Sequence, residues 1–245
     1  TSGAKVHLGV TELEAEGEGH LQKVRFQQGA APWKELPADL LLLHHGVVPN
    51  VQITRQLGCE HAWYEKQRYW EPVLDQWGNT SIENVAVAGD SGRVCGSANS
   101  LLTGRLAALE TARALGKIDL AQQTALAAPL LKKQDQELAI RPFLDTLFPP
   151  RHPWLVPKNE ETLVCRCEEV RVREIRDAVR LGALSPDRVK PMVRCGMGPC
   201  QARMCGLTVS EIIADERQVS PADVGYFRVR SPIKPVTLGQ LTGVE

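Results

Sequence analysis

Cysteine spacing is the feature of this sequence that points most directly to chemistry. Five of the seven cysteines lie within a stretch of 41 residues, as the pair Cys165-Arg-Cys167 followed by Cys195, Cys200 and Cys205. Thiolates are soft ligands that select iron or zinc over hard cations, and a C-x-C pair combined with a later C-x4-C pair suits an iron–sulfur cluster. The spacing therefore predicts a metal centre that carries electrons.

Five candidates compete for four ligand positions. Cys200 follows a Gly-Met-Gly-Pro turn and is expected to begin a helix, and Cys205 lies about one helical turn later. Free amides at a helix start stabilise anionic sulfur. We therefore expect Cys165, Cys167, Cys200 and Cys205 to bind the metal, with Cys195 as a near neighbour or a substitute.

A structural zinc site is the alternative for these cysteines, because a small module of short helices buries little apolar surface by itself. Zinc sites more often use C-x-x-C pairs, so the spacing favours iron–sulfur. Arg166, Arg194 and Arg203 lie beside the cysteines in sequence. Cations near an anionic cluster raise its reduction potential, whereas solvated arginines do not, and the sequence leaves both roles open.

A second candidate site follows the apolar run 85–88, which predicts a buried strand. The run continues into Gly89-Asp90-Ser91-Gly92, where small residues allow a sharp turn and the close approach of a ligand. A carboxylate at the end of such a strand accepts hydrogen bonds from ribose or ribityl hydroxyls. Asp90 is equally suited to stabilising the turn or capping the helix that begins near Ser97.

The surrounding pattern predicts strands and helices typical of a nucleotide-binding sheet. Residues 5–10 and 21–26 alternate as half-buried strands do, and residues 38–45 are apolar on both faces, as a central strand would be. A helix rich in alanine and leucine is predicted from Ser97 to Gly116. Strand, tight acidic turn and helix together form the recurring unit of such a sheet.

Prolines mark the expected domain boundary in residues 148–157, because they cannot continue a regular element. Beyond it, short helices are predicted at residues 172–181, after Ser185-Pro186, and at residues 208–216. We expect four segments: a nucleotide-binding part (1–125), a linker (126–158), a small mostly helical cysteine domain (159–217) and an extended tail (218–245).

Composition excludes several classes of function. The chain has 245 residues, is 43% hydrophobic and carries no formal net charge, which argues against nucleic acid as a partner. No apolar run approaches the roughly 20 residues that span a bilayer, and no secretory signal is evident. Clustered thiols in such a chain predict metal ligands in a reducing, cytoplasmic compartment. No acid–base or nucleophile constellation is apparent.

The nucleotide-binding part resembles a known family. Residues 39–50, 84–90 and 96–116 are similar to the second half of the pyridine nucleotide–disulfide oxidoreductases. The resemblance implies that Asp90 binds the ribityl chain of FAD, with the flavin or its pyrophosphate near four further residues: Gly89, Gly96, Ser97 and Ala98.

The cysteine motifs at residues 164–168 and 194–205 resemble the bacterioferritin-associated-ferredoxin (BFD) type of [2Fe-2S] domain. Both parts in this order, with the tail at residues 232–238, are similar to the larger subunits of opine oxidases, hydrogen cyanide synthase and heteromeric proline or hydroxyproline dehydrogenases. This resemblance implies an α/β chain: a partial doubly wound FAD/NAD(P)-binding domain followed by a small, mostly helical [2Fe-2S] domain. It also implies an electron-transfer subunit that works beside a substrate-oxidising flavoprotein.

The sequence departs from the family at one point. The family holds the dinucleotide phosphates with Gly-x-Gly-x-x-Gly loops, and no such loop occurs here. We expect the missing half on the same chain or on another one. The alternative function is a zinc-binding docking or sensing module on a degenerate nucleotide-binding fold.

Overall fold

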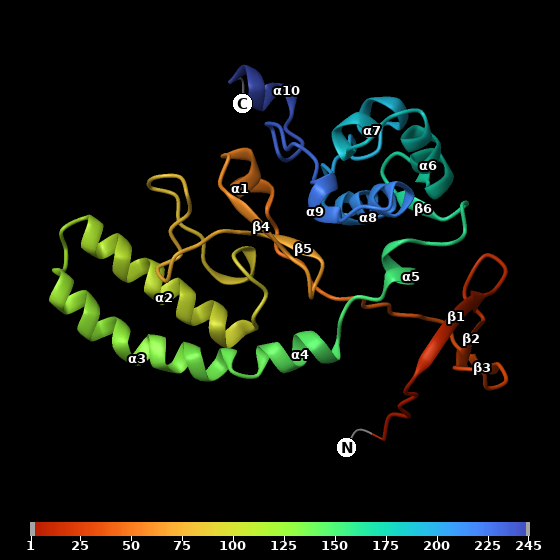
Figure 1. Cartoon of the computed structure of the whole chain (residues 1–245), viewed down its shortest axis with the longest axis horizontal. Helices are drawn as coiled ribbons and strands as arrows, with labels where there is room; N and C mark the ends of the chain where they lie inside the picture. Colours follow the sequence, from red (N-terminus) through yellow and green to blue (C-terminus); the bar gives the residue numbers. More distant parts are fainter. Residues whose placement is uncertain (1–2, 244–245) are drawn as a thin grey trace. The chain divides into compact units, whose positions relative to one another are not determined.

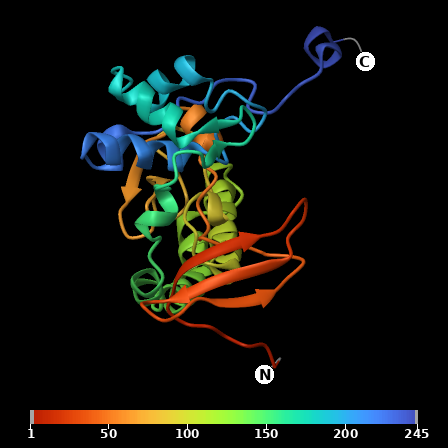
Figure 2. The same cartoon turned by 90° about the vertical axis from the view of Figure 1, so that its right-hand side faces the viewer.

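The computed structural model describes residues 3–243, and the chain divides into two compact units, residues 1–45 and 46–245. The first unit contains a three-stranded antiparallel sheet in the order β1-β2-β3 (Figure 2). Val24 and Phe26 are buried on β2, with the period of two that a half-buried strand requires. The strands are β1 (Val10–Glu16), β2 (Lys23–Gln28) and β3 (Lys34–Pro37).

The predicted strands at residues 5–10 and 38–45 are wrong: only Val10 of the first enters a strand, and the second forms no regular element. Leu40 and Leu42 are exposed, Leu42 to 83%. A strand that is apolar on both faces needs hydrogen-bonded neighbours and covering layers. The sheets formed by the described residues offer residues 38–45 no such neighbour.

The second unit begins with α1 (Gln52–Gln56) and an antiparallel hairpin of β4 (His61–Tyr64) and β5 (Tyr69–Pro72). The predicted strand at residues 85–88 is reduced to a single bridge between Ala86 and Asn79, so this prediction is also wrong. The turn that follows it forms the short 3-10 helix η1 (Gly89–Ser91).

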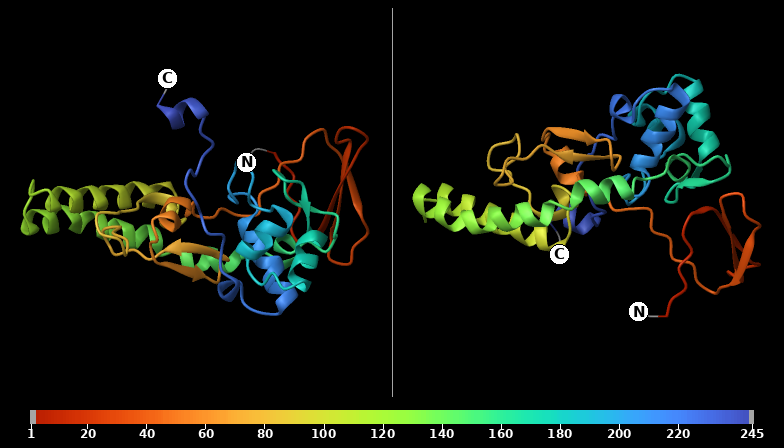
Figure 3. Two further views of the ribbon diagram at one scale, coloured as in Figure 1. Left: turned by 90° about the horizontal axis from the view of Figure 1, so that it is seen from above. Right: turned by 60° about the horizontal axis from the view of Figure 1, so that its bottom comes forward.

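Two long helices, α2 (Ser97–Ala114) and α3 (Leu120–Leu138), lie side by side (Figures 1 and 3). Leu102, Leu106 and Ala127 are their buried apolar residues. The predicted helix at residues 97–116 is confirmed. The chain leaves α2 through Gly116, whose φ of +65° favours glycine. The helix that follows, α3, has 19 residues.

A cysteine module, defined here as residues 163–227, follows α4 (Arg141–Leu147) and α5 (His152–Leu155). It consists of a small hairpin, β6 (Leu163–Cys165) and β7 (Val170–Arg171), and four helices: α6 (Val172–Arg180), α7 (Pro186–Val193), α8 (Gly206–Arg217) and α9 (Pro221–Val224). The three predicted helices are confirmed as α6, α7 and α8. Buried aliphatic residues from all parts of the module form one core, which Phe227 at the end of the module completes.

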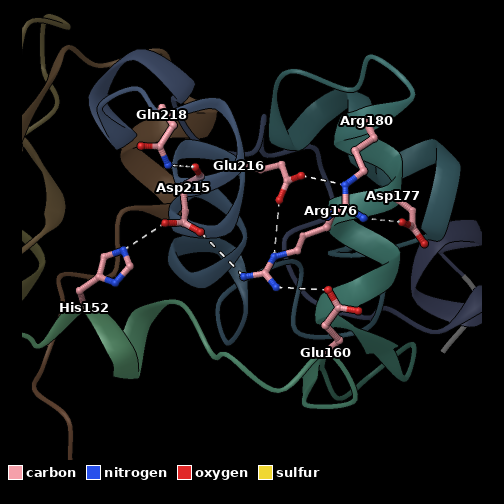
Figure 4. Close-up of polar contacts among 8 residues, drawn as sticks. All are labelled: His152, Glu160, Arg176, Asp177, Arg180, Asp215, Glu216 and Gln218. Carbon is pink, nitrogen blue, oxygen red and sulfur yellow. Dashed lines mark hydrogen bonds and ion pairs between the residues drawn. The ribbon is translucent and has the colours of Figure 1, made fainter.

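A polar network joins the segment before the module to its helices (Figure 4). Arg176 on α6 is its centre, and its carboxylate partners at 3.5 to 3.8 Å are Glu160, Asp215 and Glu216. His152 of α5 approaches Asp215 at 3.4 Å. Several charges in one network hold a surface better than isolated pairs do, so these contacts fix α6 against α8.

The tail is less extended than predicted. It contains α9 and, within residues 225–243, the short helix α10 (Leu238–Thr242). The bounds of the four expected segments remain predictions. In the described part of the chain, no helix combines the length and apolar character needed to cross a membrane.

Candidate metal centre

The fold brings cysteine sulfurs from distant parts of the sequence together. The sulfurs of Cys165, Cys195 and Cys205 all lie within 4.8 Å of one another, and all three residues are buried. The Cys195 and Cys205 sulfurs are 4.0 Å apart. Three buried thiols at this separation match a soft-metal site far better than a chance apolar cluster.

The two remaining cysteines of the motif meet each other at a more exposed position. Cys167 is exposed and Cys200 is half-buried. The Cys200 backbone hydrogen bond lowers the pKa of Cys167, but the Cys200 thiol and desolvation raise it, and the net shift is upward. All four predicted ligands therefore lie in two adjoining groups, and Cys195 joins the buried one.

Crowding of protonated thiols is evident at Cys205. Its hydrogen bond with Cys195, followed by burial, raises the pKa of the Cys205 thiol. Metal binding would remove the proton of the Cys205 thiol and replace its contact with Cys195 by a metal–sulfur bond. The donor set thus fits an iron–sulfur cluster: soft sulfurs, two groups, and a protein framework that already holds them close.

Local structure explains how each sulfur is placed. Cys165 ends β6, opposite Val170 of β7. Cys195 follows Arg194, which ends α7 in the left-handed conformation. Cys205 is the N-cap residue of α8, whereas Cys200 lies in the preceding turns. The expectation that Cys200 begins a helix is therefore wrong, and the amides of the helix start favour anionic sulfur at Cys205 instead.

Gly198 makes the close approach of the cysteine loop possible. A Cβ atom at this position would lie 2.2 Å from the Cβ of Cys167 and 3.2 Å from its sulfur.

We expect Gly198→Ala to push the loop away from Cys167 and to lower the iron content of the purified protein, measured per chain. The matched control is Gly104→Ala in the interior of α2, where a Cβ meets nothing within 4 Å. This control should keep its iron and gain about 0.5–1 kcal/mol of stability. Equal iron content in both variants would contradict the role of Gly198.

The second predicted site lies at the start of α2. Gly89 has a φ of +70°, and its amide donates to the Thr103 hydroxyl at 2.9 Å. Asp90 is exposed and accepts a hydrogen bond from Ser100 at 3.0 Å. This hydrogen bond stabilises the turn, as the sequence allowed for Asp90. The carboxylate has further lone pairs that can accept hydrogen bonds from a ligand.

The predicted residues Gly96, Ser97 and Ala98 are exposed at the same end of α2. Gly96 is the N-cap residue, and no side chain caps this helix start. The structure thus places the five predicted cofactor residues on two elements in contact, η1 and the start of α2. An uncapped start of an 18-residue helix suits a phosphate group.

A cavity of about 410 Å³ adjoins the Gly89 turn and includes residues that the sequence did not suggest. Glu71 and Arg93 form an ion pair at 3.1 Å on its wall, beside Cys95. Burial raises the pKa of Glu71. Asn99 and Thr103 of α2 also line the cavity. No sequence signal marks Glu71, because neither spacing nor neighbours distinguish it from a surface carboxylate.

Comparisons with known proteins agree with this arrangement. Residues 163–215 match the BFD-like [2Fe-2S] binding domain. Over 97% of its length the chain is 44% identical to an opine oxidase subunit from Rhizobium meliloti, covering 45% of that protein. It is 28% identical to hydrogen cyanide synthase subunit HcnB of Pseudomonas aeruginosa, over 96% of the chain and 52% of that protein. The chain therefore spans about half the length of the curated relatives it matches.

A solved structure shows the same fold. The crystal structure of L-proline dehydrogenase from P. horikoshii matches with a TM-score of 0.72 and 20% identity, over 95% of this chain and 44% of the other. This match, together with the [2Fe-2S] domain match, confirms the α/β fold class. The resemblance predicted from the cysteine motifs and the Gly89-Asp90 turn is confirmed as well: the chain is similar to opine oxidase subunits over 97% of its length, and its residues 163–215 match a BFD-like [2Fe-2S] binding domain.

Proposed function

We propose that this chain is the electron-transferring part of a heteromeric, FAD-dependent amine or imino-acid dehydrogenase of the opine, proline or hydroxyproline type. The convergence of five cysteine sulfurs within the [2Fe-2S] domain is the observation that carries the proposal. The relatives are named as oxidase and synthase subunits, which supports an oxidoreductase with a partner chain. That partner is a substrate-oxidising flavoprotein, and the assembly works in the cytoplasm.

The residues of this chain have distinct roles in the proposal. Cys165, Cys167 and Cys200 bind the cluster, and Cys205 is the fourth ligand, with Cys195 as the alternative. A [2Fe-2S] cluster supplies one-electron transfer, which connects two-electron flavin chemistry to an acceptor. The burial of three of the five sulfurs keeps water from that side of the centre.

The Gly89-Asp90 turn and the start of α2 bind the flavin in this proposal. The Asp90 carboxylate accepts hydrogen bonds from ribityl hydroxyls. Gly89 lets the backbone approach, and the start of α2 at Gly96, Ser97 and Ala98 faces the flavin or its pyrophosphate. These residues orient the cofactor, while the oxidised substrate binds on the partner.

Elemental and spectral analysis of the native assembly tests the proposal. Purified without oxygen, it should contain about two iron and two acid-labile sulfide per copy of this chain, together with bound FAD. The cluster should give a broad visible absorption that dithionite bleaches. One zinc per chain and no iron would overturn the proposal and favour a zinc-binding docking or sensing module.

A further inference from the structure

The three arginines beside the cysteines occupy different environments. Arg194 is 66% exposed, and its guanidinium donates to Glu168 at 2.8 Å. Arg166 is exposed. Arg203 is half-buried, and within residues 3–243 no carboxylate forms an ion pair with it. Solvent and a paired carboxylate screen the charge of Arg194, whereas neither screens that of Arg203 to the same extent.

Two carbonyl groups fix the position of the Arg203 guanidinium. Its Nη1 donates to the carbonyl of Cys200 at 3.0 Å, and its Nη2 donates to the carbonyl of Ile233 at 2.6 Å. The planar guanidinium cannot leave this geometry without breaking both bonds. Arg203 therefore holds a permanent positive charge beside the backbone of a proposed ligand.

The tail that supplies the Ile233 carbonyl is itself anchored to the cysteine loop. The Tyr226 hydroxyl donates to the carbonyl of Ala202 at 3.3 Å. The ring of Phe227 is buried and lies 3.0 Å from where a Cβ atom of Gly196 would be. Tyr226 and Phe227 lie outside the residues matched by the [2Fe-2S] domain, yet both contact its cysteine loop. The charge of Arg203 is thus held between the loop and the tail.

We propose that Arg203 is a positioning residue that raises the reduction potential of the cluster. Reduction adds one electron to a centre that its thiolates and sulfides already make anionic, and a fixed nearby cation offsets part of the added charge. The hydrogen bond to the Cys200 carbonyl acts in the same direction, because it draws electron density from the peptide that bears a ligand. This inference rests on the proposed function, since it requires a cluster at the cysteines.

Redox titration of the native assembly with dithionite, followed by the visible and EPR signals of the cluster, tests the role of Arg203. Arg203→Gln removes the charge but keeps an amide donor for Cys200. We expect at least a tenfold fall in the ratio of reduced to oxidised cluster at a fixed potential, about 59 mV for a one-electron couple. Arg203→Lys keeps the charge and should stay within about threefold of the wild type. Arg194→Gln, the matched control, should also change the ratio less than about threefold.

Three outcomes would overturn the inference. An unchanged potential in Arg203→Gln, with a full complement of iron, would show that its charge has no effect. Equal shifts in Arg203→Gln and Arg203→Lys would assign the effect to geometry alone. Loss of the cluster from Arg203→Gln would make Arg203 part of the binding framework instead. A wild-type assembly without iron is a different result, which would overturn the proposed function itself.

Discussion

Replacing Cys165 or Cys200 with serine is expected to abolish iron binding. Each residue represents one of the two sulfur groups, and a serine hydroxyl does not supply the soft thiolate that iron–sulfur centres require. Iron and acid-labile sulfide should fall to the background level in both variants, with loss of the visible absorption. Cys59→Ser is the matched control, because Cys59 is buried but lies outside the cysteine module. It should retain the wild-type iron content.

The same series identifies the fourth ligand. In the proposed site, Cys165, Cys167 and Cys200 fill three of the four ligand positions, so only one more cysteine is needed. Cys195 and Cys205 are both buried, with sulfurs 4.0 Å apart, and either could fill the fourth position. We expect Cys205→Ser to lose iron and Cys195→Ser to keep it. The reverse result would assign the fourth position to Cys195. Full iron content in both Cys165→Ser and Cys200→Ser would contradict a metal centre at these residues.

Removing Arg68 is expected to lower the free energy of unfolding of the second unit by about 3–5 kcal/mol. Its guanidinium donates to both carboxylate oxygens of Glu211, at 2.8 and 2.6 Å. The Glu211 side chain is only 2% exposed, so Arg68→Ala leaves a buried carboxylate without its cation. Urea denaturation followed by circular dichroism measures the loss.

Two controls separate this effect from general damage. Arg113→Ala breaks an ion pair with Glu110 on the surface of α2 and should cost less than about 1 kcal/mol. The double variant Arg68→Met/Glu211→Gln removes both charges and should recover part of the stability that Arg68→Ala loses. If Arg68→Ala lowers the free energy of unfolding no more than Arg113→Ala does, the buried ion pair does not stabilise the second unit as proposed.

Local signals made the cysteine module predictable from sequence. The C-x-C and C-x4-C spacings predict a metal site even where the surrounding helices and strands are predicted wrongly, because a short stretch of backbone positions each pair. Helix α7 is similarly local, since Ser185-Pro186 specifies its start. The choice between Cys195 and Cys205 was not predictable, because their proximity depends on how α7 and α8 pack.

Long-range partners account for what the sequence did not reveal. The apolar runs at residues 38–45 and 85–88 carry strand propensity, but a strand exists only where a neighbour pairs with it. Arg68 and Glu211 are separated by 143 positions, so no spacing rule connects them. Likewise, sequence could not separate Arg203 from Arg194, because only packing shows which guanidinium is shielded from solvent.

Helix α8 connects the candidate metal centre to the β4–β5 hairpin. Cys205 is the N-cap residue of α8, and Glu211 lies about one and a half turns further along the helix. Arg68, the residue just before β5, donates two hydrogen bonds to the Glu211 carboxylate. One helix and one buried ion pair therefore join a proposed iron ligand, Cys205, to the strand that begins at Tyr69.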